Sequence, residues 1–394
     1  MTRFDAEVGV VGVGTMGSQT MWQLARRGVS AIGFEQFAPG HDRSGAGGES
    51  RLFRTAYLEG SHYVPLLRRS RAEWERLGTD TGVRLLHMTG GLMIGTDGSA
   101  FLDAVGRSID EHGIDHEFLD TDALRSRYPQ HAVRTGDVAY LDHESGYLRP
   151  EVAVALAASE AERLGGVVHR RARVEEIRMT DAAVEVHTDD RVFRFPRLVV
   201  SAGVWTSRLL PGITPLHEVI RIVMTWFPTA TPERFTEDVF PIFVRQSDGF
   251  DISGWPSIDG ATVKIGLNNG WDRVADPDLL DRTPPDALFD EVRDAIRTLV
   301  PGVVPEVVRA GVYMDGYTAD HDAFVGPLGW DDRVTVLGGF SGHGFKLAPA
   351  MGIVAADLVT TGSTDLPTDF LAPSRFSANV TAADRLRFGR RVGR

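Results

Sequence analysis

Two lysines stand out, because every other residue among the lysines and arginines of this sequence is an arginine. Lys264 lies in VKIGLNN and Lys346 in GGFSGHGFKLAP, and the 394 residues contain no third lysine. An ammonium is a compact point charge, whereas a guanidinium is planar, larger and spreads its charge, so the two are not interchangeable against a small anion. The two positions are therefore candidates for chemistry that needs lysine, with a buried structural lysine as the alternative.

A run of glycines near the N-terminus predicts a dinucleotide-binding turn. Gly12, Gly14 and Gly17 follow an apolar strand pattern and open a helical pattern, with Thr15 and Met16 between them. In such a turn the first glycine permits the tight bend, the second lets the backbone approach a pyrophosphate, and the third lets helix and strand pack closely. The N-terminus of the helix then faces the phosphate charge.

An acid completes this fingerprint. Glu35 ends the next apolar segment, SAIGFE, at the spacing of about 20 residues where a carboxylate binds ribose hydroxyls. A carboxylate there fits the unphosphorylated ribose of FAD or NAD better than the phosphorylated ribose of NADP. The fingerprint therefore predicts the class of cofactor but does not choose between FAD and NAD.

The segments that follow favour FAD. A nicotinamide-dependent dehydrogenase usually continues with further strand–helix repeats, but this chain continues with HDRSGAGGESRLFRTAY, a loop rich in glycine, serine and arginine. Such a loop wraps a cofactor and does not extend a sheet. Strand and helix patterns return in LVVSAGVWTSRLL and VTVLGGFSGHGFKLAPAMG, whose helix amide groups could face the cofactor. We therefore expect an α/β fold with a Rossmann-like FAD-binding domain.

Length and composition restrict the number of domains and the kinds of partner that this chain can have. A chain of 394 residues exceeds the roughly 250–300 residues that one core usually holds, so we expect two domains. The net charge of −12 argues against nucleic acid as a partner, and the absence of cysteine excludes disulfides and thiolate ligands. No segment has the roughly 20 apolar residues of a membrane span, and no secretory signal is visible. We expect a cytoplasmic protein without a membrane partner.

The motifs together resemble a known family. ESRLFR, SAGVW, VKIGL and GFSGHGFK occur in the order found in the monomeric sarcosine oxidase and N-methyltryptophan oxidase family, within the glycine oxidase and D-amino-acid oxidase superfamily. The resemblance covers nearly the whole chain and implies a monomer with a discontinuous FAD-binding domain and a mixed α+β substrate domain. The expected boundaries are 1–82, 142–216 and 308–372 for the first domain, 83–141 and 217–307 for the second, and 373–394 for an arginine-rich C-terminal tail.

The resemblance also implies a reaction. Members of this family oxidise the C–N bond of a secondary or primary amine, commonly an amino acid, to an imine that hydrolyses in water. Dioxygen takes the electrons from the flavin and becomes hydrogen peroxide. Two alternatives stay open at this point: the same fold acting as a flavin dehydrogenase or desaturase with another electron acceptor, and a nicotinamide-linked dehydrogenase.

Family positions suggest roles for five residues. Arg54 and Lys346 match the family's pair that binds the substrate carboxylate. In such a pair the arginine fork fixes the orientation of the carboxylate, and the more mobile ammonium adjusts its position to it. His343 would lie beside flavin and substrate, and Arg51 would stabilise the reduced flavin. Lys264 matches the lysine that activates dioxygen through its positive charge. The alternatives are a surface salt bridge for Arg54, a core histidine at 343 and phosphate neutralisation by Arg51.

The same mapping suggests the residues that hold the cofactor. These are Gly12, Gly14, Thr15, Met16, Gly17, Glu35, Gln36, Arg43, Ser44, Ser50, Arg51, Val174, Ala202, Gly203, Trp205, Gly342, Gly344, Phe345 and Lys346.

The chain departs from the family pattern in three places. Family members attach FAD to a cysteine at about the position of Tyr313 or Met314, and this chain has no cysteine, so we expect non-covalent FAD. Ser253 and Asn268 stand where a tyrosine and a histidine are frequent, and we expect both to contact the substrate. Loss of these rings predicts a larger or more polar pocket, and therefore a substrate larger than sarcosine.

Overall fold

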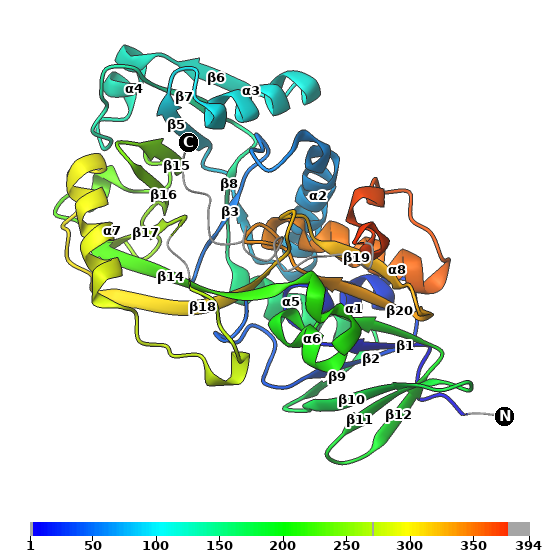
Figure 1. Cartoon of the computed structure of the whole chain (residues 1–394). Helices are drawn as coiled ribbons and strands as arrows, with labels where there is room; N and C mark the ends of the chain where they lie inside the picture. The colour runs from blue at the N-terminus through cyan, green and yellow to red at the C-terminus, as the bar shows by residue number, and fades with distance from the viewer. Residues whose placement is uncertain (1–2, 270–271, 377–394) are drawn as a thin grey trace.

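The computed structural model describes residues 3–269 and 272–376, and Figure 1 labels their helices and strands. Two large sheets, one of six and one of eight strands, organise this part of the chain, with two three-stranded sheets beside them. The expected C-terminal tail lies outside the described residues from 377 onward. No helix in the described ranges is long and apolar enough to cross a bilayer.

The six-stranded sheet has the strand order β19-β20-β13-β1-β2-β9, and only its β19–β20 pair is antiparallel. Its strands are short apolar runs, mostly buried, as expected for a parallel sheet with both faces covered. They are β1 (Val8–Val11), β2 (Ala31–Glu35), β9 (Val167–Arg170), β13 (Arg197–Val200), β19 (Phe324–Leu328) and β20 (Asp331–Gly338).

Four helices pack around this sheet. They are α1 (Thr15–Arg26), α2 (Val64–Thr81), α5 (Pro150–Arg163) and α8 (Ala348–Thr360). Helix α1 contacts both α5 and α8, which come from distant parts of the chain (Figure 1). Gly352 permits the close approach of α8, because a Cβ at this position would lie 2.7 Å from the backbone of Gln19.

Two small antiparallel sheets flank the core. One comprises β10 (Val174–Met179), β11 (Val184–Thr188) and β12 (Val192–Phe195), and the other β3 (Arg51–Phe53), β4 (Leu86–His87) and β8 (Gly146–Leu148). The short helix α6 (Thr206–Leu209) follows a 3-10 turn at Gly203–Trp205. Strand β3 comprises the central residues of the ESRLFR segment, so this segment is held in the second of these small sheets.

The eight-stranded sheet has the order β18-β14-β17-β16-β15-β5-β7-β6, antiparallel except for the β5–β15 pair. Its strands are β5 (Gly91–Thr96), β6 (His116–Leu119), β7 (Asp137–Asp142), β14 (Glu218–Pro228), β15 (Ile242–Ser247), β16 (Phe250–Trp255), β17 (Thr262–Leu267) and β18 (Arg309–Tyr317). The accompanying helices are α3 (Ala100–His112), α4 (Thr121–Arg127) and α7 (Asp286–Leu299).

Alternation along β17 decides which way Lys264 points. Val263 and Ile265 are buried in an apolar cluster with Ile296 of α7. Because successive side chains of a strand point to opposite faces, Lys264 projects from the other face. That face looks toward the segment before β3, since the ammonium donates to the carbonyls of Gly48 and Ser50.

The strands of the six-stranded sheet come from separate segments of the chain. All strands of the six-stranded sheet lie within 1–82, 142–216 and 308–372, the segments expected for the FAD-binding domain. Strand β18, however, pairs along its length with β14 in the eight-stranded sheet, although its residues were placed in the first domain. It also contacts the turn at Gly203–Trp205, so β18 lies where the two large sheets meet.

Candidate cofactor and substrate site

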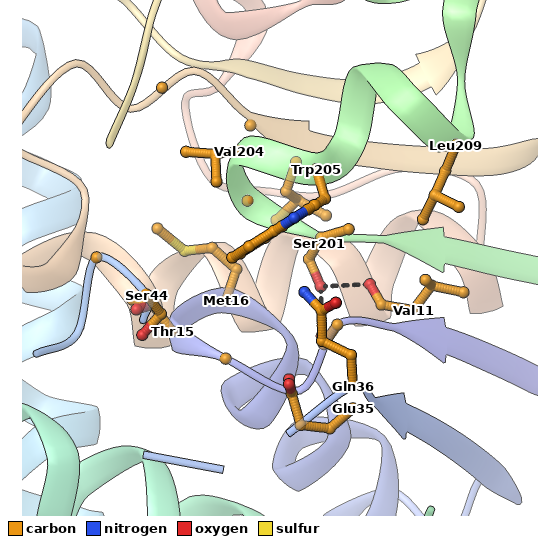
Figure 2. Close-up of a pocket in the computed structure, with 18 of the residues that line it drawn as sticks. Val11, Thr15, Met16, Glu35, Gln36, Ser44, Ser201, Val204, Trp205 and Leu209 are labelled. Atoms are coloured by element: carbon orange, nitrogen blue, oxygen red, sulfur yellow. Dashed lines mark hydrogen bonds between the residues drawn. The ribbon is translucent and has the colours of Figure 1, made fainter. Parts of the chain in front are cut away.

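A cavity lies between the N-terminus of α1, the end of β2, the Gly203–Trp205 turn and the loop before α8. Figure 2 shows Val204 and Trp205 on one side of it, and Glu35 and Gln36 on the other. The predicted cofactor residues that line it are Gly12, Gly14, Thr15, Met16, Glu35, Gln36, Ser44, Val174, Ala202, Gly203, Trp205, Gly344 and Phe345.

Each glycine of the fingerprint has a different steric environment. Gly12 adopts φ +85°, and a Cβ there would lie 2.6 Å from the carbonyl oxygen of Ser201. A Cβ on Gly17 would lie 1.8 Å from the carbonyl oxygen of Gly12, so this position admits no side chain without movement of the turn. Around Gly14 there is no protein atom within 4 Å of a Cβ, so its backbone is open to the cavity. Two glycines thus hold the turn and one leaves room for a ligand.

The end of β2 holds a buried carboxylate beside this turn. Glu35 accepts hydrogen bonds from the backbone N–H of Val13 at 3.1 Å and of Phe37 at 3.0 Å. His41 Nε2 lies 3.5 Å from the same carboxylate and also lines the cavity. The acid is therefore fixed at the edge of the cavity that the α1 N-terminus also faces, which suits a dinucleotide with its ribose here and its pyrophosphate at α1.

Lys264 is buried against aromatic rings and backbone carbonyls. Its Nζ donates to the carbonyl oxygens of Gly48 and Ser50, both at 2.7 Å, and lies 4.1 Å from the centre of the Trp255 ring. Burial, followed by the positive charge of Arg51, lowers the pKa of Lys264 well below its ordinary value. Any negative charge that forms nearby will therefore favour the protonated form.

Arg51 and Ser50 lie next to this lysine. Arg51 donates through Nη1 to the carbonyl of Ser50 and through Nη2 to the carbonyl of Gly45, both at 3.0 Å, and its guanidinium lies 5.6 Å from the Tyr313 ring centre. Glu151 of α5 supports the loop, because its carboxylate accepts from the N–H groups of Gly48 and Glu49 at 2.6 and 2.9 Å.

Arg54 and Lys346 form a second pair of buried cations, 5% and 4% exposed. Both lie against the ring of Tyr57, the guanidinium at 5.4 Å and the ammonium at 5.2 Å from its centre. Arg54 Nη2 donates to Glu59 at 2.8 Å, whereas its Nε and Nη1 have no hydrogen-bond partner in residues 3–269 and 272–376. Burial and the Arg54 charge lower the pKa of Lys346 to about 7. Two guanidinium donors are thus available to an anion.

Glu59 was not predicted from the sequence. Burial raises the pKa of this carboxyl, but the charges of Arg54 and Lys346 outweigh that effect and lower the pKa to about 2. The ionised carboxylate balances one of the two cations and orients the Arg54 fork. The motif RTAYLEG places Tyr57 and Glu59 three and five residues after Arg54, so the local sequence contained a signal for both.

His343 contacts the same group of residues through Tyr57. Its Nε2 lies 3.0 Å from the carbonyl oxygen of His321, which can only accept, so Nε2 carries the proton. Its Nδ1, 2.9 Å from the Tyr57 hydroxyl, therefore accepts from that hydroxyl. Burial lowers the pKa of His343 to about 4, so the ring is neutral at physiological pH. Lys346 Nζ donates to the backbone carbonyl of His343 at 3.1 Å.

Ser253 and Asn268, expected to contact the substrate, contact each other. Ser253 Oγ donates to Asn268 Oδ1 at 2.9 Å, and Asn268 Nδ2 donates to Asp251 at 2.6 Å. Asn268 follows β17 at an even spacing from Lys264, so both side chains project from the same face of the eight-stranded sheet. The wall that faces the six-stranded sheet is polar at these positions.

Two further predicted cofactor residues do not line this cavity. Arg43 lines a neighbouring pocket with Gln36 and Trp205, and its guanidinium lies over the Phe37 ring at 4.9 Å. Gly342 has φ +84° and donates its N–H to Asp315, an acid of the cavity wall that the sequence motifs did not indicate. In the described ranges no cluster of histidine and acidic side chains could hold a metal ion.

Comparison with known proteins agrees with this geometry. The model of the family described as FAD dependent oxidoreductase matches residues 7–358. The chain is 32% identical over 378 residues to a monomeric sarcosine oxidase of Streptomyces avermitilis, covering 94% of this chain and 98% of that protein. It is also 32% identical over 359 residues to an N-methyl-L-tryptophan oxidase of Yersinia pestis, covering 89% and 94%.

Among solved structures, NikD, an amino acid oxidase essential for nikkomycin biosynthesis, superposes with a TM-score of 0.82 over 94% of this chain and 98% of its own, at 22% identity. A glycine oxidase of Geobacillus kaustophilus reaches 0.79 over 93% and 98% at 20% identity. These two likenesses concern the fold. The family match over most of the chain and the glycine turn, acid and cavity described above lead to one conclusion: the chain belongs to the FAD-dependent oxidoreductases, and within them it groups with the sarcosine and N-methyltryptophan oxidases.

Proposed function

We propose that this protein oxidises the C–N bond of an amino acid carrying a primary or secondary amine, with FAD as its cofactor and dioxygen as the electron acceptor. The observation that carries the proposal is the pair of buried cations Arg54 and Lys346. Two N–H groups of the Arg54 fork have no partner in the described residues, and a buried donor without a partner is costly. A carboxylate is an anion that such charged donors and a neighbouring ammonium would bind.

The residues around the pair explain how a substrate would be held. Asp142 accepts from the N–H groups of Thr55 and Ala56 and fixes the segment that carries Arg54. Tyr57 lies between the two cations and His343, so it keeps Lys346 beside the loop that lines the cofactor cavity. FAD, when bound, supplies the redox chemistry by accepting a hydride equivalent from the carbon beside nitrogen. The protein's task is to position that carbon and keep the amine uncharged.

The substrate expected here is larger or more polar than sarcosine. Ser253, Asn268 and Asp251 form a polar row on the face of the eight-stranded sheet that carries Lys264. A polar substituent on the amino acid could exchange hydrogen bonds with this row. The released products would be an imine and hydrogen peroxide, and the protein is expected to act as a monomer.

Binding of small carboxylic acids tests the proposal. Acids such as propionate should perturb the visible flavin spectrum of the purified holoprotein. Arg54→Ala and Lys346→Ala should each weaken this binding by roughly 1.5–3 kcal/mol, the scale of a charge-assisted hydrogen bond. Arg125→Ala is the matched control, because Arg125 is half exposed and pairs only with the exposed Asp122 among the described residues.

Turnover completes the test. A panel of primary and N-methyl amino acids is screened for oxygen consumption and peroxide formation. Equal affinity of the acids for all four proteins would contradict the carboxylate site. Flavin reduction by an amine without oxygen consumption would instead indicate another electron acceptor.

A further inference from the structure

The cavity contains an acid for which the roles above have no use. Asp315 lies on β18, lines the cavity with Met314 and Gly316, and shares a face of the strand with Tyr313. Its Oδ2 accepts from the N–H of Gly342 at 2.9 Å, and its Oδ1 accepts from the N–H of Gly316 at 2.8 Å. The carboxylate therefore lies against the loop that carries His343 and Lys346.

The charges of two cations act on this acid. The charges of Arg51 and Lys346 both lower the pKa of Asp315, but burial is the larger effect and raises the pKa to about 6. The other titratable groups nearby are Tyr313 and Tyr317 on β18 itself, His217 beside Gly316, and His343 next to Gly342. Burial lowers the pKa of each of the two histidines to about 4, so both are neutral when Asp315 titrates. The pKa of Lys346 is about 7, so the experiment has to distinguish the titration of Lys346 from that of Asp315.

The charge pattern fits an amino acid zwitterion. The carboxylate and the ammonium of an amino acid are separated by a single carbon atom. With the carboxylate on Arg54 and Lys346, the ammonium lies within a few ångströms of Lys346 and needs an anion. Asp315 is a cavity acid whose charge interacts with that of Lys346. Oxidation of the C–N bond also requires that the ammonium first lose a proton, because the nitrogen lone pair stabilises the developing imine.

We propose that Asp315 holds the ammonium of the substrate and accepts one proton from it. An N–H bond of the substrate breaks and an O–H bond forms on Asp315, while no electron moves in this step. The two electrons and the hydrogen leave the adjacent carbon afterwards, with FAD as the oxidant. The acid returns its proton to solvent when the product leaves. This role rests on the proposed function, since it presupposes a substrate carboxylate on Arg54 and Lys346.

Two ligands of the same shape test the charge recognition without turnover. Trimethylglycine carries a quaternary ammonium and cannot lose an N–H proton, and 3,3-dimethylbutanoate replaces that nitrogen with carbon. Their dissociation constants are measured on the holoprotein by flavin difference spectra at pH 8, where Asp315 is ionised. The wild type should prefer trimethylglycine, and Asp315→Asn should lose at least about tenfold of this preference, since two opposite charges in contact at a site partly removed from water interact by more than this. Lys346→Met should weaken both ligands and keep the preference.

The pH dependence of flavin reduction tests the proton transfer. In anaerobic stopped-flow experiments with an amine that reduces the flavin, the wild-type rate should rise through about pH 6 and then level off, because the ionised carboxylate accepts the proton. In Asp315→Asn the plateau should disappear, and the rate should rise tenfold per pH unit toward the pKa of the free amine. Lys346→Met should retain this limb but move it to higher pH, because the charge of Lys346 lowers the pKa of Asp315.

The outcomes separate the two proposals. If neither ligand binds the wild type, the carboxylate site and the proposed function fail together. If both bind, and the preference is the same in wild type and Asp315→Asn, the role of Asp315 is wrong and the proposed function stands. Asp315→Ala serves as a second variant. Loss of flavin from both variants would show that Asp315 anchors the Gly342 loop, which would also overturn the proposal.

Discussion

At the scale of single residues, Lys264 differs from the arginines because of the space it occupies. Its ammonium fits between the carbonyls of Gly48 and Ser50 and the ring of Trp255. A guanidinium is too large and planar to replace it there without displacing one of these groups. The lowered pKa means that the positive charge is favoured most when negative charge appears nearby, as in the reduction of dioxygen.

Replacement of Lys264 should therefore slow reoxidation more than reduction. In Lys264→Met, reoxidation of the reduced flavin by dioxygen should fall by about 10²–10³-fold, or roughly 3–4 kcal/mol of barrier, the cost of losing one preorganised electrostatic group. Stopped-flow mixing of pre-reduced protein with dioxygen measures this step separately from substrate binding.

Lys264→Arg is the matched variant, since it keeps a positive charge but not its position. It should stay substantially impaired. Thermal unfolding of both variants checks that the carbonyls of Gly48 and Ser50, which lose their donor, have not disrupted the loop. Reoxidation at the wild-type rate in Lys264→Met would show that the lysine is structural.

At the scale of elements, two glycines of the β1–α1 turn have different functions. Gly17 provides space for the protein itself, since a Cβ there would lie 1.8 Å from the carbonyl oxygen of Gly12. Gly14 has no protein neighbour within 4 Å of a Cβ, so any crowding at that position would come from a ligand.

Two alanine substitutions should therefore behave differently. Gly17→Ala should destabilise the apoprotein, because the turn has to move away from α1. Gly14→Ala should leave the apoprotein as stable as wild type and weaken FAD binding about tenfold or more, because a methyl group would stand between the backbone and the pyrophosphate. Denaturant unfolding of the apoproteins and fluorescence titration with FAD measure the two effects. A Gly14→Ala protein that binds FAD at wild-type strength would place the cofactor elsewhere.

At the scale of the whole molecule, the cavity is built from segments far apart in sequence. Residues of the N-terminal turn, the middle segment around Ala202 and the loop before α8 line it together, and β18 of the eight-stranded sheet closes part of its wall. A ligand that binds all of them stabilises the folded state over the unfolded chain by mass action. FAD is therefore expected to hold the two large sheets together.

The chain should release its flavin intact on denaturation. Purified protein should be yellow, and acid precipitation should leave all FAD in the supernatant. Added FAD should raise the Tm of the apoprotein, because FAD at 100 times its Kd raises the free energy of unfolding by about 2.7 kcal/mol. The reason is the absence of cysteine, which excludes a cysteinyl link. Flavin that stays in the pellet, as a mass adduct on a peptide containing Tyr313, would contradict this.

Features that depend on short stretches of chain could be predicted from the amino-acid sequence. The glycine turn, its following helix and Glu35 could be predicted because their geometry is set by backbone conformation over a few residues. The apolar runs of β1 and β20 likewise indicated a buried sheet. The two lysines were recognisable because the rest of the chain uses arginine.

Contacts between residues far apart in the chain could not be predicted in this way. Tyr57 and His343 are separated by 286 positions and share a hydrogen bond, and Asp315 reaches Gly342 across a loop whose course no local pattern specifies. The same holds for the pairing of β18 with β14, which no local pattern specifies. Local spacing determines which face a side chain occupies, whereas contacts between distant segments depend on how whole sheets and helices pack.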